Sequence, residues 1–546
     1  MTTFDFDFET QKIFNKNFSN IQKTDWRKWL DISSREEYEE LSLKLSGLSS
    51  VDDIFKRIKS EITESRSFSI DLEDYLNKYQ DNNSLIFCHT SGTTNSNLSM
   101  LKWFHMAKDL VKRQWAPGMQ AIFESSGLDS KSSVIIFVPS RLKFDGIRTY
   151  EEKKYVSLYS SEFSQRIMLS VVKPKSYLFY EYRNSRNLDI ISKILEIDNI
   201  SVISAPALTI LGWADITRLQ EGIEKSLNLI NRNQNPKLEE LLSKIEKRGL
   251  VSVSNEIQKE LSEKISKATL VFSISSLSKS DWDLIRKFMK WEEGNEKFTN
   301  LYVASEIGPF AASITMGDYE LSRSNRMYIF PLTLPMIEYK GNKEAVSRAK
   351  SKFGKLYVSR LHTEGVLINI DLGDVISIKN KEGLPQIDGK ILRSSFQLKY
   401  PINLSKKVAI KEPYQVLAGD YFEFSNFEIY NPRFLLNCLK RKCELNIDSL
   451  LLIGKNKGSE KLWSLFLYSD VKSNCSSFNN YSKILFECIE NKTLKNALLN
   501  NEIKIKLINE NPVDFLAKRS EILEKVRNGK NPKGILKKWP LYIVDK

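Results

Sequence analysis

The sequence predicts an α/β fold with a large N-terminal domain of mixed or parallel sheets, a barrel-like subdomain and a small α+β C-terminal domain. From residue 84 onward, short apolar runs alternate with amphipathic stretches, which is typical of sheets covered by helices. A chain of 546 residues is also too long for one hydrophobic core. We therefore expect two domains, 1–388 and 389–546, with the boundary between residues 389 and 425.

The N-terminal domain is predicted from six strands and the helices between them. Residues 1–80 are charged and have a helical pattern. The strand candidates are rich in β-branched or aromatic residues and most end at Pro, Ser or Gly: 84–88, 133–138, 176–182, 200–204, 269–274 and 300–304. The clearest helix is "NPKLEELLSKIEKRG", which Asn235 caps, Pro236 opens and Gly249 ends.

Beyond residue 330 the pattern changes. Short strands broken by Gly and Asp predict an antiparallel or barrel-like subdomain, in "GKLYVSRL", "GVLINIDLGDVISIKN" and "GKILRSSFQL". In the C-terminal domain we expect strands at 449–454, 463–468 and 503–508. Helices are expected in "NPRFLLNCLKRK" and "PVDFLAKRSEILEKVRNG".

Composition limits the class of protein. Charged residues make up 27% of the chain, the net charge is +14, and the lysines are dispersed among glutamates. This dispersal favours a solvated basic surface, while nucleic-acid binding through phosphates stays open. The acidic N-terminus lacks a signal pattern, and no apolar run approaches the ~20 residues that span a bilayer. We expect a cytoplasmic protein without a membrane partner.

Cysteine and histidine are few. The five cysteines have no short paired spacings, and the three histidines are far apart. We therefore expect neither a disulfide framework nor a zinc site.

One polar segment directly follows the first predicted strand. In "LIFCHTSGTTNSNLSMLKW" the residues after the strand are Thr90, Ser91, Gly92, Thr93 and Thr94. Ligands bind at the carboxyl ends of strands in open α/β sheets, and hydroxyls beside a glycine can surround a phosphate. The alternative is an ordinary polar turn. The GxxxxGK[ST] spacing of a Walker loop is absent.

This segment resembles the phosphate loop of the adenylate-forming (ANL) superfamily, TSGTTG followed by Pro-Lys. "TSGTT" matches letter for letter, but Asn95 stands at the next glycine and Leu98 at the lysine, for which Lys102 could substitute. The short lead before the loop resembles the phenylacetate–CoA ligase, LuxE-like acyl-protein synthetase and GH3-like branches.

A second segment, "NLYVASEIGPFAAS", resembles the superfamily's YGxTE motif. The resemblance implies that Tyr302 packs beside adenine, with Ser305 in register, and that Glu306 helps to hold Mg²⁺. A carboxylate at a strand end suits this hard cation. The alternative role of Glu306 is a helix-capping carboxylate.

Two further segments resemble the superfamily's ribose and hinge motifs. In "LGDV", Asp374 would bind both ribose hydroxyls, although Asn369 stands at the family's arginine; the alternative is a Gly-Asp turn between strands. In "QIDGKILRSS", Lys390 stands where the hinge motif has arginine.

The tail "RNGKNPKGILKKWPLYIVDK" resembles the segment that carries the superfamily's mobile catalytic lysine. Lys533 or Lys530 would fill this role by neutralising charge as a carboxylate attacks the α-phosphate. The alternative is a basic solvated tail.

Taken together, the resemblance implies a ligase that forms acyl-AMP and pyrophosphate from ATP with Mg²⁺. The acyl group would pass to a thiol, of coenzyme A or a carrier protein, or to an amine. The residues leave open which carboxylic acid and which acceptor are used. Two alternatives remain: a non-catalytic nucleotide- or acyl-binding member of the same fold, and a basic nucleic-acid-binding protein.

Overall fold

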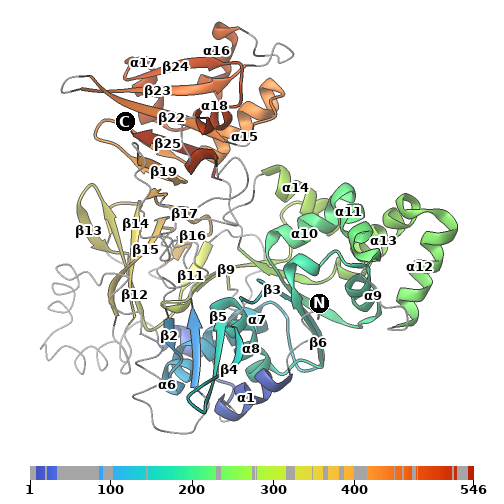
Figure 1. Ribbon diagram of the computed structural model, residues 1–546. Coiled ribbons are helices and arrows are strands. Elements are labelled where there is room, and N and C mark those ends of the chain that lie inside the picture. The colour runs from blue at the N-terminus through green and yellow to red at the C-terminus, as the bar shows by residue number, and fades with distance from the viewer. Residues whose placement is uncertain are drawn as a thin grey trace, which may run out of the picture. The chain divides into compact units, whose positions relative to one another are not determined.

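The computed structural model (Figure 1) describes residues 8–18, 21–32, 85–89, 103–142, 145–228, 235–273, 277, 279–314, 326–346, 349–360, 367–379, 386–398, 415–447, 449–457, 460–469, 475, 477–518, 522–524 and 539–545. These residues divide into two compact units. The first holds the described residues up to Leu372 and those among 377–390, and the second holds Gly373–Ile376 and those from Ile391 onward.

The largest sheet of the first unit has eight strands in the order β16-β11-β10-β9-β8-β7-β3-β6. Strands β6, β3, β7, β8 and β9 are parallel, and β10, β11 and β16 extend the sheet antiparallel. Their bounds are β3 Ser133–Val138, β6 Ser176–Glu181, β7 Ile200–Ser204, β8 Thr269–Phe272, β9 Phe298–Ala304, β10 Gly308–Ala312, β11 Arg326–Ile329 and β16 Gln386–Asp388. The predicted α/β fold is confirmed.

Helices cover both faces of this sheet because its central strands are apolar on both sides. Ile135 and Phe137 of β3 pack into one cluster, while Val134 and Ile136 pack into another. The first cluster includes α9 Leu188–Glu196, α10 Ala207–Ala214, α11 Ile216–Leu227, α12 Pro236–Arg248, α13 Leu250–Ile265 and α14 Lys279–Phe288. The second includes α2 Trp26–Ile32, α7 Ala116–Ser125 and α8 Ser160–Val172.

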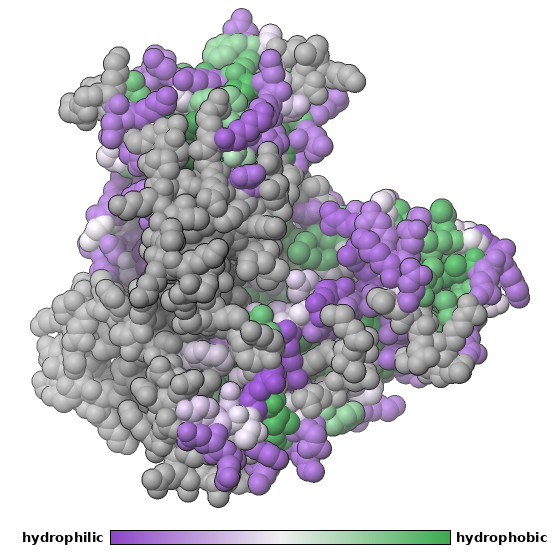
Figure 2. Space-filling view, in the orientation of Figure 1, coloured by the Kyte–Doolittle hydropathy of each residue, from purple (hydrophilic) through white to green (hydrophobic). Residues whose placement is uncertain are grey.

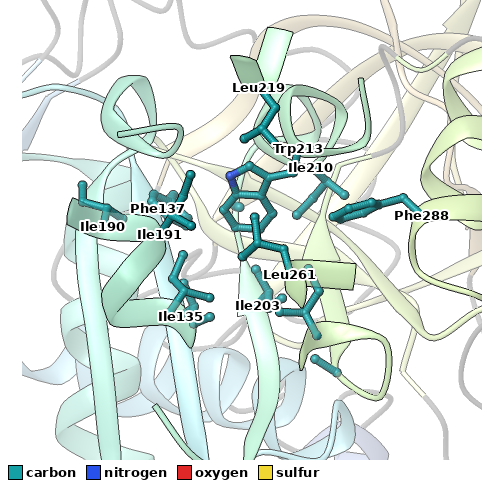
Figure 3. Close-up of a cluster of buried hydrophobic side chains, with 14 of the residues drawn as sticks. Ile135, Phe137, Ile190, Ile191, Ile203, Ile210, Trp213, Leu219, Leu261 and Phe288 are labelled. Atoms are coloured by element: carbon teal, nitrogen blue, oxygen red, sulfur yellow. The ribbon is translucent and has the colours of Figure 1, made fainter. Parts of the chain in front are cut away.

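Trp213 of α10 is a large buried member of the first cluster (Figure 3). Its ring meets Phe137 edge to face at 5.7 Å between centroids. The indole N–H donates to the Ser185 carbonyl at 2.9 Å, so its polar atom is satisfied in the core. Burying each large apolar side chain here stabilises the fold by about 1.5–3 kcal/mol.

A second sheet of the first unit has the order β2-β1-β5-β4. Its strands are β1 Leu85–His89, β2 Trp103–His105, β4 Gly146–Tyr150 and β5 Lys153–Tyr159. Strands β1 and β5 are parallel. Ile86 and Cys88 pack with α1 (Phe8–Phe18), α8 and the helical run of α6 (Lys108–Leu110) and Val111–Trp115. Because side chains alternate along a strand, Phe87 and His89 face the opposite side.

A five-stranded sheet follows, in the order β13-β12-β14-β15-β17. Its strands are β12 Thr333–Tyr339, β13 Asn342–Ala345, β14 Phe353–Arg360, β15 Leu367–Ser377 and β17 Leu392–Arg393. The segments from which we predicted an antiparallel subdomain supply β14, β15 and β17.

The second unit is built on a six-stranded sheet in the order β18-β19-β25-β22-β23-β24. Its strands are β18 Phe396–Gln397, β19 Gln415–Gly419, β22 Leu450–Lys457, β23 Glu460–Tyr468, β24 Ile503–Ile508 and β25 Leu541–Asp545; a separate hairpin pairs β20 Tyr421–Glu423 with β21 Glu428–Tyr430. The helices are α15 Pro432–Cys443, α16 Phe478–Cys488, α17 Lys492–Leu499 and α18 Pro512–Ala517. This confirms the α+β character predicted for the C-terminal part.

Strand β25 was not predicted from the sequence. It lies between β19 and β22, parallel to β22, and its residues Leu541 to Val544 are buried. Because these residues follow a lysine-rich stretch, the sequence alone indicated the end of a basic tail. Their burial shows that the chain's last described residues belong to the core of the second unit.

The expectation that the cysteines form no disulfides is wrong. Cys438 is bonded to Cys488 and Cys443 to Cys475, with Cα–Cα separations of 5.7 and 5.3 Å. The partners are 50 and 32 residues apart, so short spacing did not reveal them. The first bond joins α15 to α16, and the second joins the end of α15 to Cys475, just before α16. Disulfides are rare in the reducing cytosol. The cytoplasmic location stays a prediction.

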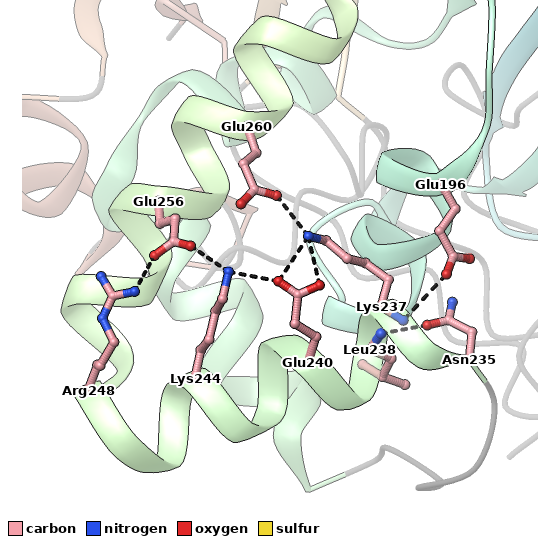
Figure 4. Close-up of polar contacts among 9 residues, drawn as sticks. All are labelled: Glu196, Asn235, Lys237, Leu238, Glu240, Lys244, Arg248, Glu256 and Glu260. Atoms are coloured by element: carbon pink, nitrogen blue, oxygen red, sulfur yellow. Dashed lines mark hydrogen bonds and ion pairs between the residues drawn. The ribbon is translucent and has the colours of Figure 1, made fainter.

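Helix α12 forms as predicted. The Asn235 side chain accepts from the Leu238 N–H, Pro236 opens the helix, and Gly249 ends it with φ +80°. Charged side chains then tie α12 to α13 (Figure 4). These ion pairs are Lys237–Glu260 at 3.2 Å, Lys244–Glu256 at 2.6 Å and Arg248–Glu256 at 2.6 Å, with Glu240 bridging Lys237 and Lys244 within α12.

Hydrophilic side chains cover most of the described surface that Figure 2 presents. Among the helices that the structure describes, none is long and apolar enough to cross a lipid bilayer.

Reduction of the disulfides should destabilise the second unit. Each bond closes a loop of tens of residues, and such a bond typically contributes about 2–4 kcal/mol. We expect the Cys438→Ser/Cys488→Ser variant to unfold at lower urea concentration than wild type under non-reducing conditions, and added dithiothreitol to lower the wild-type midpoint. The Cys88→Ser variant, which changes the free cysteine, is the control. A wild-type midpoint unaffected by dithiothreitol, with five titratable thiols in urea, would contradict the pairing.

The ion pairs between α12 and α13 should contribute little and only at low salt. Replacing Lys244 with Met is expected to lower the free energy of unfolding by less than about 1 kcal/mol, because solvent and salt screen a partly exposed pair. Urea titrations at low and high NaCl measure this, with Lys247→Met on the same helix as control. A loss that persists at high NaCl would show that Lys244 stabilises by packing instead.

Candidate functional site

The predicted magnesium and adenine segment lies where β9 turns into β10. Tyr302 meets Phe310 edge to face at 5.3 Å, and Glu306 is partly exposed in the turn. Gly308 has φ +95°, and a Cβ there would lie 2.9 Å from the Trp115 ring, so only glycine fits. The close approach of Trp115 therefore fixes the turn that presents Glu306.

A hydrogen bond joins this turn to the second sheet. The Ser305 hydroxyl donates to the Ser160 hydroxyl at 2.9 Å, and Ser160 opens α8 directly after β5. In the register of the parallel pair, Tyr159 at the end of β5 lies beside His89 at the end of β1. The strand ends that precede Thr90 and Ser305 in the sequence thus lie at one edge of the first unit. Thr90, Ser91, Gly92, Thr93 and Thr94 themselves lie outside the described residues.

Arg360 is a neighbour of Glu306 that the sequence reasoning missed. It ends β14, is 8% exposed, and its Nη1 donates to the Glu306 carbonyl at 3.2 Å. Burial lowers the pKa of Arg360 to about 10, so the guanidinium is still charged at neutral pH. A buried cation beside this turn would attract the phosphates of a nucleotide. No local motif marks Arg360. Its position depends on the pairing of β14 with β12, in which Arg360 lies opposite Thr333.

In the second unit, Asp374 forms an ion pair that the sequence reasoning also missed. Arg393 Nη1 lies 3.1 Å from Asp374 Oδ1, across the β15–β17 pairing. Gly373 has φ +68°, and a Cβ there would lie 2.8 Å from the same guanidinium. The alternative of a Gly-Asp turn is wrong, because both residues lie inside β15. The sequence signal that could have revealed this ion pair is Arg393, the only arginine of "QIDGKILRSS", three residues after Lys390.

Lys390 lies in the first unit, close to β9. Its backbone N–H donates to Asp388 Oδ1 at 2.9 Å, and the neighbouring Gly389 carbonyl accepts from Asn300 Nδ2 at 2.9 Å. Asn300 precedes Tyr302 by two positions on β9. Tyr302 therefore lies on β9, Ser305 and Glu306 lie in the turn after it, and Lys390 follows Gly389, which is hydrogen-bonded to β9. Lys530 and Lys533 lie outside the described residues.

A magnesium ion fits this site only with a single protein carboxylate. Among the residues that the structure describes, no group of three or more His, Cys, Asp or Glu side chains could hold a metal. Magnesium in nucleotide sites commonly takes one or two carboxylates and completes its shell with phosphate oxygens and water. Glu306, partly exposed in its turn, satisfies that requirement.

Comparison with known sequences finds nothing. No protein-family model matches the chain, and no curated protein matches it.

Comparison with solved structures finds similar chains at low identity. A 2-hydroxyisobutyryl-CoA ligase, solved in complex with 2-HIB-AMP and CoA, is 12% identical with a TM-score of 0.47, covering 92% of this chain and 87% of the ligase. The acyl acid amido synthetase AtGH3.15, in complex with 2,4-DB, is 13% identical with a TM-score of 0.47, covering 98% and 94%. The amide bond synthetase McbA from Marinactinospora thermotolerans is 9% identical with a TM-score of 0.36, covering 76% and 64%.

The structures to which this chain is similar thus include a CoA ligase, an acyl acid amido synthetase and an amide bond synthetase. The TM-scores are all below 0.5, which is too low for the likeness to support a functional argument. That argument depends on the residues of this chain.

Proposed function

We propose that this protein is an ATP-dependent ligase that activates a carboxylic acid as its acyl-adenylate and transfers the acyl group to a thiol or an amine. The observation that supports the proposal is the junction in the first unit. There the Ser305–Ser160 hydrogen bond and the His89–Tyr159 pairing bring the carboxyl end of β1 and the turn after β9 to one edge. A chance likeness of "TSGTT" and "ASE" to family motifs would not require their strands to end together.

The proposed chemistry has two steps that conserve atoms and charge. A substrate carboxylate oxygen attacks the α-phosphorus of ATP, the bond to the bridging oxygen breaks, and pyrophosphate leaves. A thiol or amine then attacks the acyl carbon, its proton goes to solvent or a base, and AMP leaves. The protein's main task is to position the reactants and to neutralise charge.

Each proposed site residue has one part in this chemistry. In the first unit, Glu306 would hold Mg²⁺, which neutralises phosphate charge when bound, and Tyr302 would pack beside adenine. Lys390 would contact a phosphate or ribose oxygen. In the second unit, Asp374 would accept hydrogen bonds from the ribose hydroxyls, and Lys530 or Lys533 would approach the α-phosphate. Thr90, Ser91, Gly92, Thr93 and Thr94 would bind the phosphates of ATP.

A non-catalytic nucleotide-binding protein of the same fold is the second candidate. The observation that favours it is Asn369, which stands at the family's arginine, is fully buried and lies in the core beside Ser359. Its side chain therefore cannot reach out to a ligand as an arginine would. Such a protein would bind ATP without exchanging pyrophosphate.

Replacing Glu306 with Gln should lower the rate of carboxylate-dependent ATP–pyrophosphate exchange by about 100-fold, because one charge that organises the phosphates is lost. The rate is measured with a panel of aliphatic, aromatic and hydroxy acids over a range of Mg²⁺ concentrations. Thermal unfolding of the variant verifies that it is folded.

The matched control is Glu224→Gln, at an exposed position on α11, and it should exchange at the wild-type rate. An unchanged rate in Glu306→Gln would remove Glu306 from the site. A wild-type protein that binds ATP but exchanges with no acid would favour the second candidate.

Replacing Asp374 with Asn should raise the KM for ATP by about tenfold or more, because a charged acceptor of two hydroxyls becomes neutral. Asp371→Asn is the control, since Asp371 lies on the same strand and is ion-paired with Lys355 at 2.7 Å. Equal effects of the two substitutions on the KM for ATP would mean that Asp374 only stabilises its strand.

A further inference from the structure

A buried histidine–aspartate pair lies at the end of β1. His89 Nε2 and Asp145 Oδ1 are 2.7 Å apart, and both side chains are 0% exposed. A carboxylate can only accept a hydrogen bond, so the proton lies on Nε2 and the imidazole is held in one orientation. His89 is the last residue of β1, directly before Thr90 in the sequence.

Hydrogen bonds with Leu142 and Arg148 hold Asp145 in place. Its Oδ2 accepts from the Leu142 N–H at 2.7 Å, and its own N–H donates to the Leu142 carbonyl at 2.9 Å. Arg148 Nη2 donates to the Asp145 carbonyl at 3.0 Å. Both carboxylate oxygens are therefore engaged, and Asp145 has little freedom to turn away from His89.

Two aromatic rings enclose the imidazole. The Trp103 ring lies at 5.1 Å and the Tyr159 ring at 4.5 Å between centroids. Tyr159 directly precedes Ser160, whose hydroxyl accepts from Ser305. One chain of contacts thus runs from Asp145 through His89 and Tyr159 to the turn that carries Glu306.

A buried ionisable pair of this kind is weak evidence for stability. Desolvation offsets much of the attraction, and apolar residues of similar volume are often as stable in its place. This pair lies at the end of β1, beside the candidate site, and three further hydrogen bonds hold Asp145. Such a pair is better suited to fix the orientation of the neighbouring backbone.

We infer that His89 and Asp145 are positioning residues for nucleotide use: their hydrogen bond fixes the carboxyl end of β1 against Tyr159 and Ser160. This inference rests on the proposed function. Neither residue is placed in contact with the reacting atoms, so substitution should alter the affinity for ATP and leave the KM for the carboxylic acid unchanged.

The test is a series of three substitutions at His89. Gln presents an amide N–H near the place of Nε2 and can keep the bond to Asp145. Asn is too short to do so, and Phe keeps only the ring. We expect Asn and Phe to weaken ATP binding, and to raise the KM for ATP in the exchange reaction, by about tenfold or more, and Gln to stay within about threefold of wild type.

The control is His105→Gln, on the neighbouring strand β2, whose position pairs with Phe87. ATP affinity is measured by calorimetry with MgATP as the probe, together with thermal unfolding and with the KM for the carboxylic acid. Wild-type affinity in all three His89 variants would overturn the inference. A loss of ATP affinity that is fully explained by a smaller fraction of folded protein would also overturn it.

The calorimetry separates this inference from the proposed function. A wild type that binds MgATP without exchanging pyrophosphate would refute the ligase proposal, and the binding series would still decide the role of His89. A wild type that neither binds nor exchanges would refute both.

Discussion

Helix α8 is the element on which the first unit depends, because it packs against both of its helix-covered sheets. Phe163, Ile167 and Val171 join the cluster beneath β1 and β5, while Met168, Leu169 and Val172 join the cluster under the eight-stranded sheet. A helix with two apolar faces must be buried between two layers. Since α8 begins at Ser160, its placement also decides where Ser160 meets Ser305.

A buried charge cluster fixes the same helix. Glu162 Oε1 lies 2.9 Å from Arg166 Nη2 and 2.6 Å from Arg141 Nη2. Burial raises the pKa of the Glu162 carboxyl, but the charges and hydrogen bonds of Arg166 and Arg141 outweigh it and hold the pKa below its usual value. Removing one partner of such a cluster typically costs about 3–5 kcal/mol, because the remaining charge is buried alone. The cluster therefore specifies one arrangement of α8 and Arg141, which directly precedes Leu142, the backbone partner of Asp145.

The two units contribute different chemistry to the proposed reaction. The first contains the turn with Glu306, the buried Arg360 and the His89–Asp145 pair. The second contains Asp374 with Arg393, and two disulfides that tie α15 to α16 and to the segment just before it.

Local pattern was sufficient to predict the five parallel strands of the large sheet, the helix 236–248 with its Asn235 cap, and the α+β character of the C-terminal part. These features depend on periodicity and on capping residues, which neighbours in sequence determine. The resemblances to family motifs depend on the same kind of short-range reading, and β1 and β9, the strands of two of these segments, end at one edge of the first unit.

Tertiary structure alone decided the contacts between distant residues. The disulfide partners, the Arg393–Asp374 ion pair, the place of Arg360 beside Glu306 and the buried partner of His89 each join segments that no spacing rule connects. Strand β25 was missed for the same reason, because its neighbours β19 and β22 are far away in sequence. Which residues meet is set by the packing of whole layers, and a local stretch of sequence does not contain that information.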